Sequence, residues 1–318
     1  MKRNNSILIY ALMGAATIFL TVIHFETFSQ NTLYKRLVYE WNAPGDQATF
    51  PVVLVLGGSE GGLTYAREWA KVLTKKGFGV MALAYFGSEG LNKQLEEIPM
   101  EYFQQALDTL KTFKGVMIDK IAIISISKGT EPALLLASEN KSIRLVIAAS
   151  PSHVVWQGIN RADYSSIKSS LTKNGNPLPF VHYDYSKGYY PIINFYLGAL
   201  DKPVDEQTII PVGNSNARII LFSGDQDQIW PSNLMSEAIK KRLKLKNHDE
   251  QLLSFNYPNA GHAFLIPYQT SDEKKEILKG IIEHISFLGG SIEAFDEAMT
   301  QSNEIVMIEL LKMKNDDN

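Results

Sequence analysis

Short runs of β-branched residues alternate with helical patterns along most of the chain. FPVVLVLGG (50–58), VMALAYFG (80–87) and KIAIISIS (120–127) are almost continuously apolar, which is typical of strands buried on both faces of a parallel sheet. Repeated strand–helix alternation predicts a doubly wound, mostly parallel sheet with helices on both faces. Further strands are predicted at 143–152, 217–224 and 251–258, with one or two edge strands within 33–48, and helices at 64–79, 100–115, 130–139, 232–243, 273–288 and 291–313.

Composition limits the classes of function. The chain has 318 residues and a net charge of -3, which gives no electrostatic reason to expect a nucleic-acid partner. It contains no cysteine, so disulfides, a cysteine nucleophile and a thiolate metal site are excluded. No motif predicts a cofactor or a metal ion.

The first 29 residues differ from the rest of the chain. Lys2 and Arg3 precede an apolar run with no further Asp, Glu, Lys or Arg before Glu26. A basic start, an apolar stretch and small residues ahead of a cut after Ser29 are typical of a secretory signal peptide. The run is also close to the roughly 20 residues that span a bilayer, so an uncleaved anchor is the alternative, with membrane association only through residues 7–23. Either interpretation predicts export, with residues 30–318 forming one domain.

Residues 152–216 interrupt the alternation. This long connection carries six of the chain's fourteen tyrosines, most of them within NGNPLPFVHYDYSKGYYPIINFYLG (174–198). A connection of this length inside a compact domain is usually functional, so we predict a cap over the substrate. An aromatic-rich subdomain that packs only on itself is the alternative. The candidate pocket residues are Trp156, Phe180, Tyr183 and Tyr185.

Ser127 is the candidate nucleophile. KIAIISISKGTEPALLLAS reads as a strand, a tight turn and a helix, with small residues two positions to either side of Ser127. That is the arrangement of the nucleophile turn G-x-S-x-G, with Ser125 in place of the first glycine and Gly129 as the second. An ordinary serine-rich turn is the alternative.

Asp227 and His262 are the candidate acid and base. Asp227 follows a strand in FSGDQDQIWPS, and it is preferred over Asp225 because Gly-x-x-Asp-x-x-x-Pro is the usual spacing in α/β-hydrolases. His262 follows the last predicted strand, within AGHAF. Parallel strands bring their carboxyl ends to one edge of a sheet, so Ser127, Asp227 and His262 are predicted to meet there. Their order along the chain is that of the α/β-hydrolase fold.

Two loops can supply the donors of an oxyanion hole. The backbone amides of Gly58 and Ser59, within LGGSEGG (56–62), and of Lys128 are the candidates. These glycines could equally approach a phosphate, but the loop lacks the spacings G-x-x-x-x-G-K-[ST] and G-x-G-x-x-G of nucleotide sites. The residues together predict attack of Ser127 on a carbonyl carbon and a covalent acyl-enzyme.

These motifs resemble one family. LVLGGSEGG, SISKGTEPALLLAS, SSLTKNGNPLPF, LFSGDQDQIWPS and AGHAF are similar to the C-terminal catalytic domain shared by acyl-CoA thioesterases and bile acid-CoA:amino acid N-acyltransferase, over roughly residues 50–300. Ser-Lys-Gly followed by Glu131 is that family's form of the nucleophile turn. The resemblance implies an α/β-hydrolase fold and a hydrolase of acyl thioesters, with Ser127 as nucleophile, Asp227 as acid and His262 as base.

Several functions would use the same residues. The N-acyltransferase branch resembles cysteine enzymes, so water is the expected acyl acceptor in this cysteine-free chain. An exported protein would meet little coenzyme A, which leaves an exported carboxylesterase, a dienelactone-type hydrolase or a peptidase as alternatives. A non-catalytic binding protein on the same fold is the remaining alternative. The expected partner is a small-molecule acyl ester or thioester.

Intact-mass measurement of the protein isolated from its native host tests the leader. We expect a mature chain that begins at Gln30, because Thr27 and Ser29 place small residues three and one positions before the cut. A retained Met1–Ser29 segment would instead identify an anchored protein.

Overall fold

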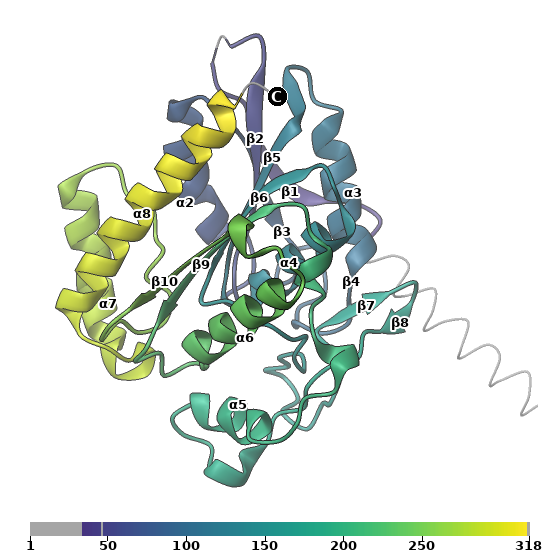
Figure 1. Cartoon of the computed structure of the whole chain (residues 1–318), viewed down its shortest axis with the longest axis vertical. Coiled ribbons are helices and arrows are strands. Elements are labelled where there is room, and N and C mark those ends of the chain that lie inside the picture. Colours follow the sequence, from purple (N-terminus) through teal and green to yellow (C-terminus); the bar gives the residue numbers. More distant parts are fainter. Residues whose placement is uncertain (1–33, 46, 317–318) are drawn as a thin grey trace, which may run out of the picture.

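A seven-stranded sheet forms the centre of the computed structural model, which describes residues 34–45 and 47–316. The strand order is β1-β3-β2-β5-β6-β9-β10 (Figure 1). β1 is antiparallel to β3, and every other neighbouring pair is parallel, as predicted. The strands are β1 (Val38–Asn42), β2 (Phe50–Leu56), β3 (Gly79–Ala84), β5 (Val116–Ile126), β6 (Ile143–Ala149), β9 (Arg218–Gly224) and β10 (Leu252–Tyr257).

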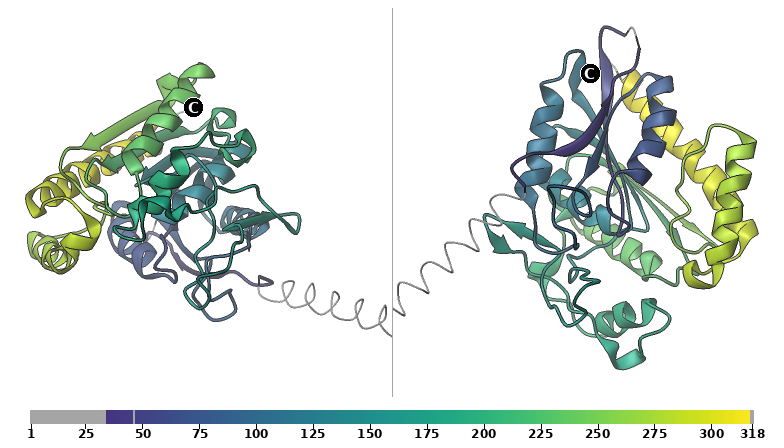
Figure 2. Two further views of the ribbon diagram at one scale, coloured as in Figure 1. Left: turned by 90° about the horizontal axis from the view of Figure 1, so that it is seen from below. Right: turned by 180° about the vertical axis from the view of Figure 1, so that it is seen from behind.

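Helices cover both faces of this sheet (Figures 1 and 2). The side chains of β2 show why the strands are continuously apolar. Val52, Leu54 and Leu56 join one buried cluster and Val53 and Val55 join the other, since successive side chains of a strand point to opposite faces. The first face packs on α3 (Met100–Lys111), α4 (Thr130–Glu139) and α6 (Ser232–Leu245), and the second on α2 (Thr64–Leu73), α7 (Ser271–Leu288) and α8 (Ile292–Asn315).

The predicted helix at 64–79 ends earlier than its pattern suggests. Residues Thr64–Leu73 form α2, which buries Ala66, Trp69 and Leu73 on one side. A 3-10 turn, η1 (Thr74–Lys76), tightens the end, and Gly77 then closes it with a φ of 82°. Glycine adopts this left-handed conformation without a Cβ clash, so the chain can turn sharply into β3.

Residues 152–216 form a separate layer at the end of the sheet where α5 lies in Figure 1. Val154, Trp156, Tyr196 and Ala199 pack there with Trp230, which precedes α6, in a third buried apolar cluster. The layer also completes a small sheet with β4 (Ile98–Pro99) from the main domain. Its elements are β7 (Leu171–Lys173), β8 (Asn176–Pro177), η3 (Tyr185–Lys187), α5 (Ile193–Leu200), η4 (Glu206–Thr208) and η5 (Val212–Asn214).

The predicted leader, residues 1–29, lies outside the described residues, and export stays a prediction from the sequence. In the part of the chain that the structure describes, no helix combines the length and the hydropathy that a membrane crossing needs.

Candidate active site

The turn that carries Ser127 is strained. β5 ends at Ile126, the 3-10 turn η2 (Ser127–Gly129) follows, and α4 begins at once. Ser127 has a φ of 52°, in the left-handed region that residues other than glycine rarely occupy. Such strain is typical of a nucleophile turn, which lifts the serine side chain above the end of the sheet.

Close backbone packing explains the second small residue of this turn. A Cβ atom added at Gly129 would lie 2.1 Å from the carbonyl oxygen of Gly57, at the end of β2. Only glycine fits there without moving the backbone. The hydroxyl of Thr130 donates to the carbonyl oxygen of Ser127 at 2.7 Å and closes the turn from the other side.

The three predicted side chains meet in one hydrogen-bond chain. Nε2 of His262 lies 3.0 Å from Oγ of Ser127, and Nδ1 of His262 lies 2.8 Å from Oδ2 of Asp227. All three residues are buried. Because the Asp227 carboxylate accepts from Nδ1–H, it selects the tautomer in which Nε2 is free to accept the serine proton.

Asp227 rather than Asp225 contacts the histidine. The second oxygen of Asp227 accepts from the backbone amides of Ile229 at 2.9 Å and Trp230 at 3.2 Å, so the carboxylate is fixed on both sides. Asp225 is exposed, and its Oδ1 accepts from the backbone amide of Asn259 at 2.7 Å. It therefore stabilises the loop that leads to His262.

The oxyanion candidates flank Ser127. A Cβ atom added at Gly58 would lie 3.0 Å from Cβ of Ser127, so this loop touches the nucleophile directly. The amide of Gly58 donates to Oε1 of Glu60 at 2.9 Å, which the sequence did not predict. Lys128 is the second residue of a 3-10 turn, and amides at that position have no acceptor within the turn.

An apolar cavity of about 780 Å³ lies over the triad. Tyr183 and Tyr185 line it, as predicted, whereas Trp156 and Phe180 are not among its lining residues. The ring of Trp156 lies behind the lining, 4.9 Å from the ring of Tyr196, and the ring of Phe180 packs at a tilt against that of His182, with centroids 4.6 Å apart. Apolar lining residues that the sequence did not suggest include Tyr65, Ile159, Ile192, Phe195, Tyr196, Ile266 and Phe287.

Residues 152–216 have features of both interpretations, because their aromatic side chains pack on one another and also line the cavity. Tyr183, Tyr196 and Phe195 pack on one another and also face the cavity. Tyr189 and Tyr190 are mostly exposed. Among the described residues, no group of three or more histidine, aspartate or glutamate side chains is arranged to hold a metal ion.

Comparison with known proteins identifies the family. The family model described as "BAAT / Acyl-CoA thioester hydrolase C terminal" matches residues 98–305. The chain belongs to this family. It is 32% identical over 227 residues to mitochondrial acyl-coenzyme A thioesterase 2 of Mus musculus, covering 71% of this chain and 47% of that protein. It is 29% identical over 231 residues to acyl-coenzyme A thioesterase 1 of Homo sapiens, covering 71% of this chain and 51% of that protein.

The chain thus spans about half the length of the curated relatives it matches. Among solved structures, the acylaminoacyl peptidase of Pyrococcus horikoshii matches 89% of this chain and 40% of its own with a TM-score of 0.53 and 14% identity. At that identity the likeness shows the fold alone. The predicted resemblance to the family and the α/β-hydrolase fold are both confirmed.

The Lys-Gly-x-Glu part of this family member's nucleophile turn forms a buried ion pair. Nζ of Lys128 lies 2.6 Å from Oε1 of Glu131, with both side chains at most 2% exposed. Burial lowers the pKa of Lys128 and raises the pKa of Glu131, and the charge of each partner opposes the shift of the other. At this separation the mutual attraction favours the ionised pair.

This ion pair fastens residues 152–216 to the catalytic turn. The second oxygen of Glu131 accepts from the amide of Trp156 at 3.2 Å and from the hydroxyl of Ser170 at 2.8 Å. Lys128 also donates to the carbonyl oxygen of Gln157 at 3.3 Å. Trp156 and Ser170 follow Glu131 by 25 and 39 residues, so no local pattern in the sequence points to them as partners of Glu131.

Replacement of Glu131 by Gln should destabilise the fold, because Lys128 would remain buried without a counter-charge. We expect a loss of about 3 kcal/mol in the free energy of unfolding, measured by urea denaturation. Adding Lys128→Met to Glu131→Gln should cost less than the sum of the two single changes.

Glu237→Gln is the matched control, because it breaks the exposed i,i+3 pair with Lys240. We expect it to cost no more than about 0.5 kcal/mol. An equal loss in Glu131→Gln and in this control would contradict a structural role for the buried pair.

Proposed function

We propose that this chain is a serine hydrolase that cleaves acyl esters or thioesters through an acyl-enzyme on Ser127. The observation that carries the proposal is the hydrogen-bond chain from Ser127 through His262 to Asp227 at the floor of an apolar cavity. The names of the relatives, acyl-coenzyme A thioesterases, support the same reaction class.

Acylation begins when Oγ of Ser127 attacks the carbonyl carbon and Nε2 of His262 takes the hydroxyl proton. Asp227 holds Nδ1–H and stabilises the imidazolium that forms. The amides of Lys128 and Ser59 are the donors to the developing oxyanion, and the amide of Gly58 can join them only by leaving Oε1 of Glu60.

The tetrahedral intermediate then collapses, and the leaving alcohol or thiol takes the proton from Nε2. A water molecule, deprotonated by the same nitrogen of His262, attacks the acyl-enzyme. The carboxylic acid product is released, and Ser127 recovers its proton from Nε2 of His262. Each step uses one proton that passes through Nε2, so the single Ser127–His262 contact serves both halves of the reaction.

The cavity fits the acyl part of the substrate. Its walls are mainly aromatic and aliphatic, and a volume of about 780 Å³ lies within the range of small-molecule pockets. Each methylene buried there contributes about 0.8 kcal/mol to binding, so the cavity favours a longer apolar acyl chain over a shorter one.

Ser127→Ala should lower kcat by roughly 10⁴-fold or more while leaving the melting temperature nearly unchanged, because triad members act as a unit. A fluorophosphonate probe should label Ser127 in the parent protein, as read by mass spectrometry of the labelled peptide. Ser125 is fully buried and donates to the carbonyl oxygen of Ile147 at 3.1 Å, so Ser125→Ala should keep the label. Turnover of Ser127→Ala at the parent rate would disprove the nucleophile.

Asp227→Asn should lower kcat by about 10⁴-fold, because an amide in place of the carboxylate favours the wrong histidine tautomer. Asp225→Asn should change kcat little, since the side-chain oxygen of Asn can still accept from the amide of Asn259. Steady-state kinetics on one ester compare the two variants. The opposite order of effects would make Asp225 the acid.

A further inference from the structure

The loop after β2 has to hold its amides in one direction if it is to receive an oxyanion. Two consecutive glycines, Gly57 and Gly58, open this loop. A Cβ atom added at Gly58 would lie 3.0 Å from Cβ of Ser127 and 3.3 Å from the carbonyl oxygen of Ile126, so a larger residue would crowd the nucleophile. Glycine avoids this crowding but leaves the backbone free to rotate. Contacts from outside the loop must therefore fix its peptide groups.

The hydroxyl of Tyr85 makes such contacts. It donates to the carbonyl oxygen of Gly57 at 2.7 Å and lies 3.3 Å from that of Gly58, so its one proton is shared between successive peptide groups, mainly with the first. In a trans peptide the N–H points away from the C=O. The shorter contact therefore sets the direction of the Gly58 amide, and the longer one sets the direction of the Ser59 amide.

The same contact joins the oxyanion loop to the nucleophile turn. The carbonyl oxygen of Gly57 lies against Gly129, where the turn has no room for a Cβ atom. A rotation of the Gly57 peptide would therefore disturb the turn that carries Ser127 as well as the direction of the loop amides. The hydroxyl of Tyr85 opposes this rotation.

The side chain of Tyr85 is itself rigidly held. Its ring is 3% exposed and packs against the rings of Phe86 and Phe103, with centroids 5.2 Å and 5.4 Å apart. Tyr85 directly follows β3, and its carbonyl oxygen accepts from the hydroxyl of Tyr34 at 3.2 Å. Burial raises the pKa of Tyr85 well above its ordinary value, so the hydroxyl keeps its proton at neutral and mildly alkaline pH. The donor is therefore fixed in place.

Tyr85 does not face the substrate. It is not among the residues that line the cavity over the triad. Its hydroxyl points to the backbone of the loop instead. Any part that Tyr85 plays in the reaction must therefore pass through the peptide groups of Gly57 and Gly58.

A second side chain holds the next peptide of this loop. Nη2 of Arg161 donates to the carbonyl oxygen of Ser59 at 2.8 Å. Arg161 is exposed and lines the cavity, so its guanidinium can turn toward a substrate. Tyr85 is buried and has no such freedom. Of the two side chains, Tyr85 is the one placed to keep the loop fixed while a substrate is bound.

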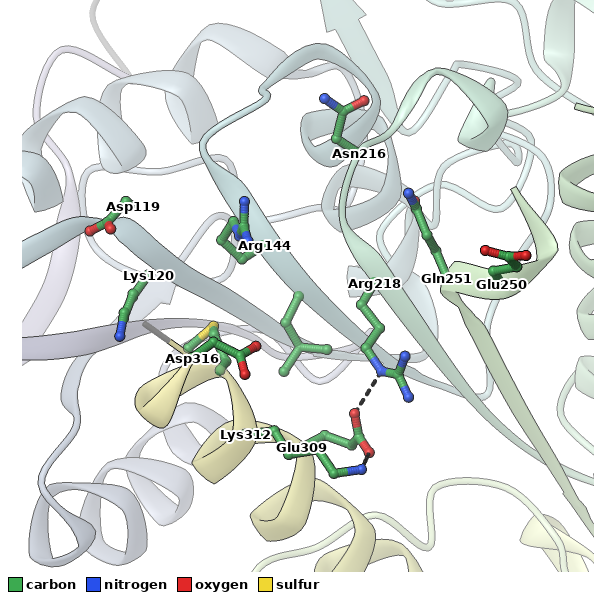
Figure 3. A pocket seen from close by; sticks show the side chains of 12 residues that line it. Asp119, Lys120, Arg144, Asn216, Arg218, Glu250, Gln251, Glu309, Lys312 and Asp316 are labelled. Carbon is green, nitrogen blue, oxygen red and sulfur yellow. Dashed lines mark hydrogen bonds and ion pairs between the residues drawn. The ribbon is translucent and has the colours of Figure 1, made fainter. Parts of the chain in front are cut away.

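Cationic side chains of the other large cavity are too far away to replace the loop amides. Lys120, Arg144 and Arg218 line this cavity at the opposite end of the sheet (Figure 3). Lys120 lies about 23 Å along β5 from Ser127, at about 3.3 Å per residue. Arg218 pairs there with Glu309 at 2.6 Å. None of these charges can face an oxyanion formed at Ser127.

We propose that Tyr85 is a positioning residue of the oxyanion hole, and that its hydroxyl fixes the loop peptides whose amides stabilise the transition state. The inference rests on the proposed serine hydrolase activity and adds a residue to it. The carbonyl oxygen of a bound substrate carries little charge, whereas it becomes an anion in the transition state. Misdirected amides therefore weaken transition-state stabilisation more than substrate binding.

Tyr85→Phe tests the proposal, because it removes only the hydroxyl. The substrate is whichever of p-nitrophenyl octanoate and octanoyl-coenzyme A the parent full-length chain cleaves faster. We expect kcat to fall by about 10- to 100-fold with KM nearly unchanged, which is less than the roughly 10²–10³-fold loss when an oxyanion donor itself is removed. An unchanged KM means that the lost interaction acts in the transition state.

Octyl trifluoromethyl ketone gives a second readout. Oγ of Ser127 adds to its carbonyl carbon, the hydroxyl proton passes to Nε2 of His262, and the carbonyl oxygen becomes an oxyanion in the position of the transition state. The inhibition constant of this ketone should rise in Tyr85→Phe by about the factor by which kcat/KM falls. A merely structural effect would not link the two quantities.

Tyr102→Phe is the matched control. Tyr102 is 1% exposed in the same apolar cluster, and its hydroxyl also donates to a backbone carbonyl oxygen, that of Ala84, at 2.7 Å. It accepts from the amide of Val38 at 2.8 Å, so it fastens β1 and β3 and not the oxyanion loop. Both variants lose a buried hydrogen bond, and we expect both to melt at a lower temperature. Only Tyr85→Phe should lose kcat.

The outcomes separate the inference from the proposed function. Parent-like kcat in Tyr85→Phe, or an equal loss of kcat in Tyr102→Phe, would overturn the inference and leave the hydrolase intact. A fall in kcat without weaker binding of the ketone would also overturn it. So would an unfolded Tyr85→Phe beside a folded Tyr102→Phe, because the hydroxyl would then hold the fold. If the parent protein cleaves neither substrate, the proposed function fails and the inference fails with it.

Discussion

The strained turn at Ser127 is the constraint on which the rest of the site depends. A positive φ at a serine costs on the order of 1–3 kcal/mol, and it persists only where the surroundings determine the backbone. Here the carbonyl oxygen of Gly57 lies against Gly129, and Thr130 closes the turn by a hydrogen bond. β2 and β5 are neighbours in the sheet, so the central pairing of the fold holds the two halves of this contact together.

Asp227 and His262 are held by similar close approaches of backbone. A Cβ atom at Gly224 would lie 2.3 Å from the carbonyl oxygen of Ala260, and one at Gly261 would lie 2.2 Å from that of Gly289. These contacts join the end of β9, the loop with His262 and the end of α7. Trp230 completes the arrangement, because its amide donates to Asp227 and its indole Nε1 donates to the carbonyl oxygen of Ser150 at 3.1 Å. Trp230 therefore links Asp227 to the third apolar cluster.

The sequence predicted what depends on local pattern and on the geometry of parallel sheets. Buried strands such as FPVVLVL are recognisable because both faces are apolar, and residues at strand ends must meet at one edge. It did not predict the partners of Glu131 or the bond from Gly58 to Glu60, which depend on how loops fold over that edge. For the same reason it did not predict that Trp156 and Phe180 lie outside the lining of this cavity. An aromatic residue in a long connection can face the cavity or lie one layer behind it, and composition does not distinguish the two.

The lining of the cavity over Ser127 comes from different parts of the chain. Residues 152–216 supply Tyr183, Phe195 and Tyr196 to this lining, whereas the loop after β2 supplies Ser59 and Glu60. The triad and its turn lie between them and contact both. Since a fold positions a reaction and its loops choose the substrate, substitutions in either segment can change the shape of the cavity while the turn at Ser127 stays the same.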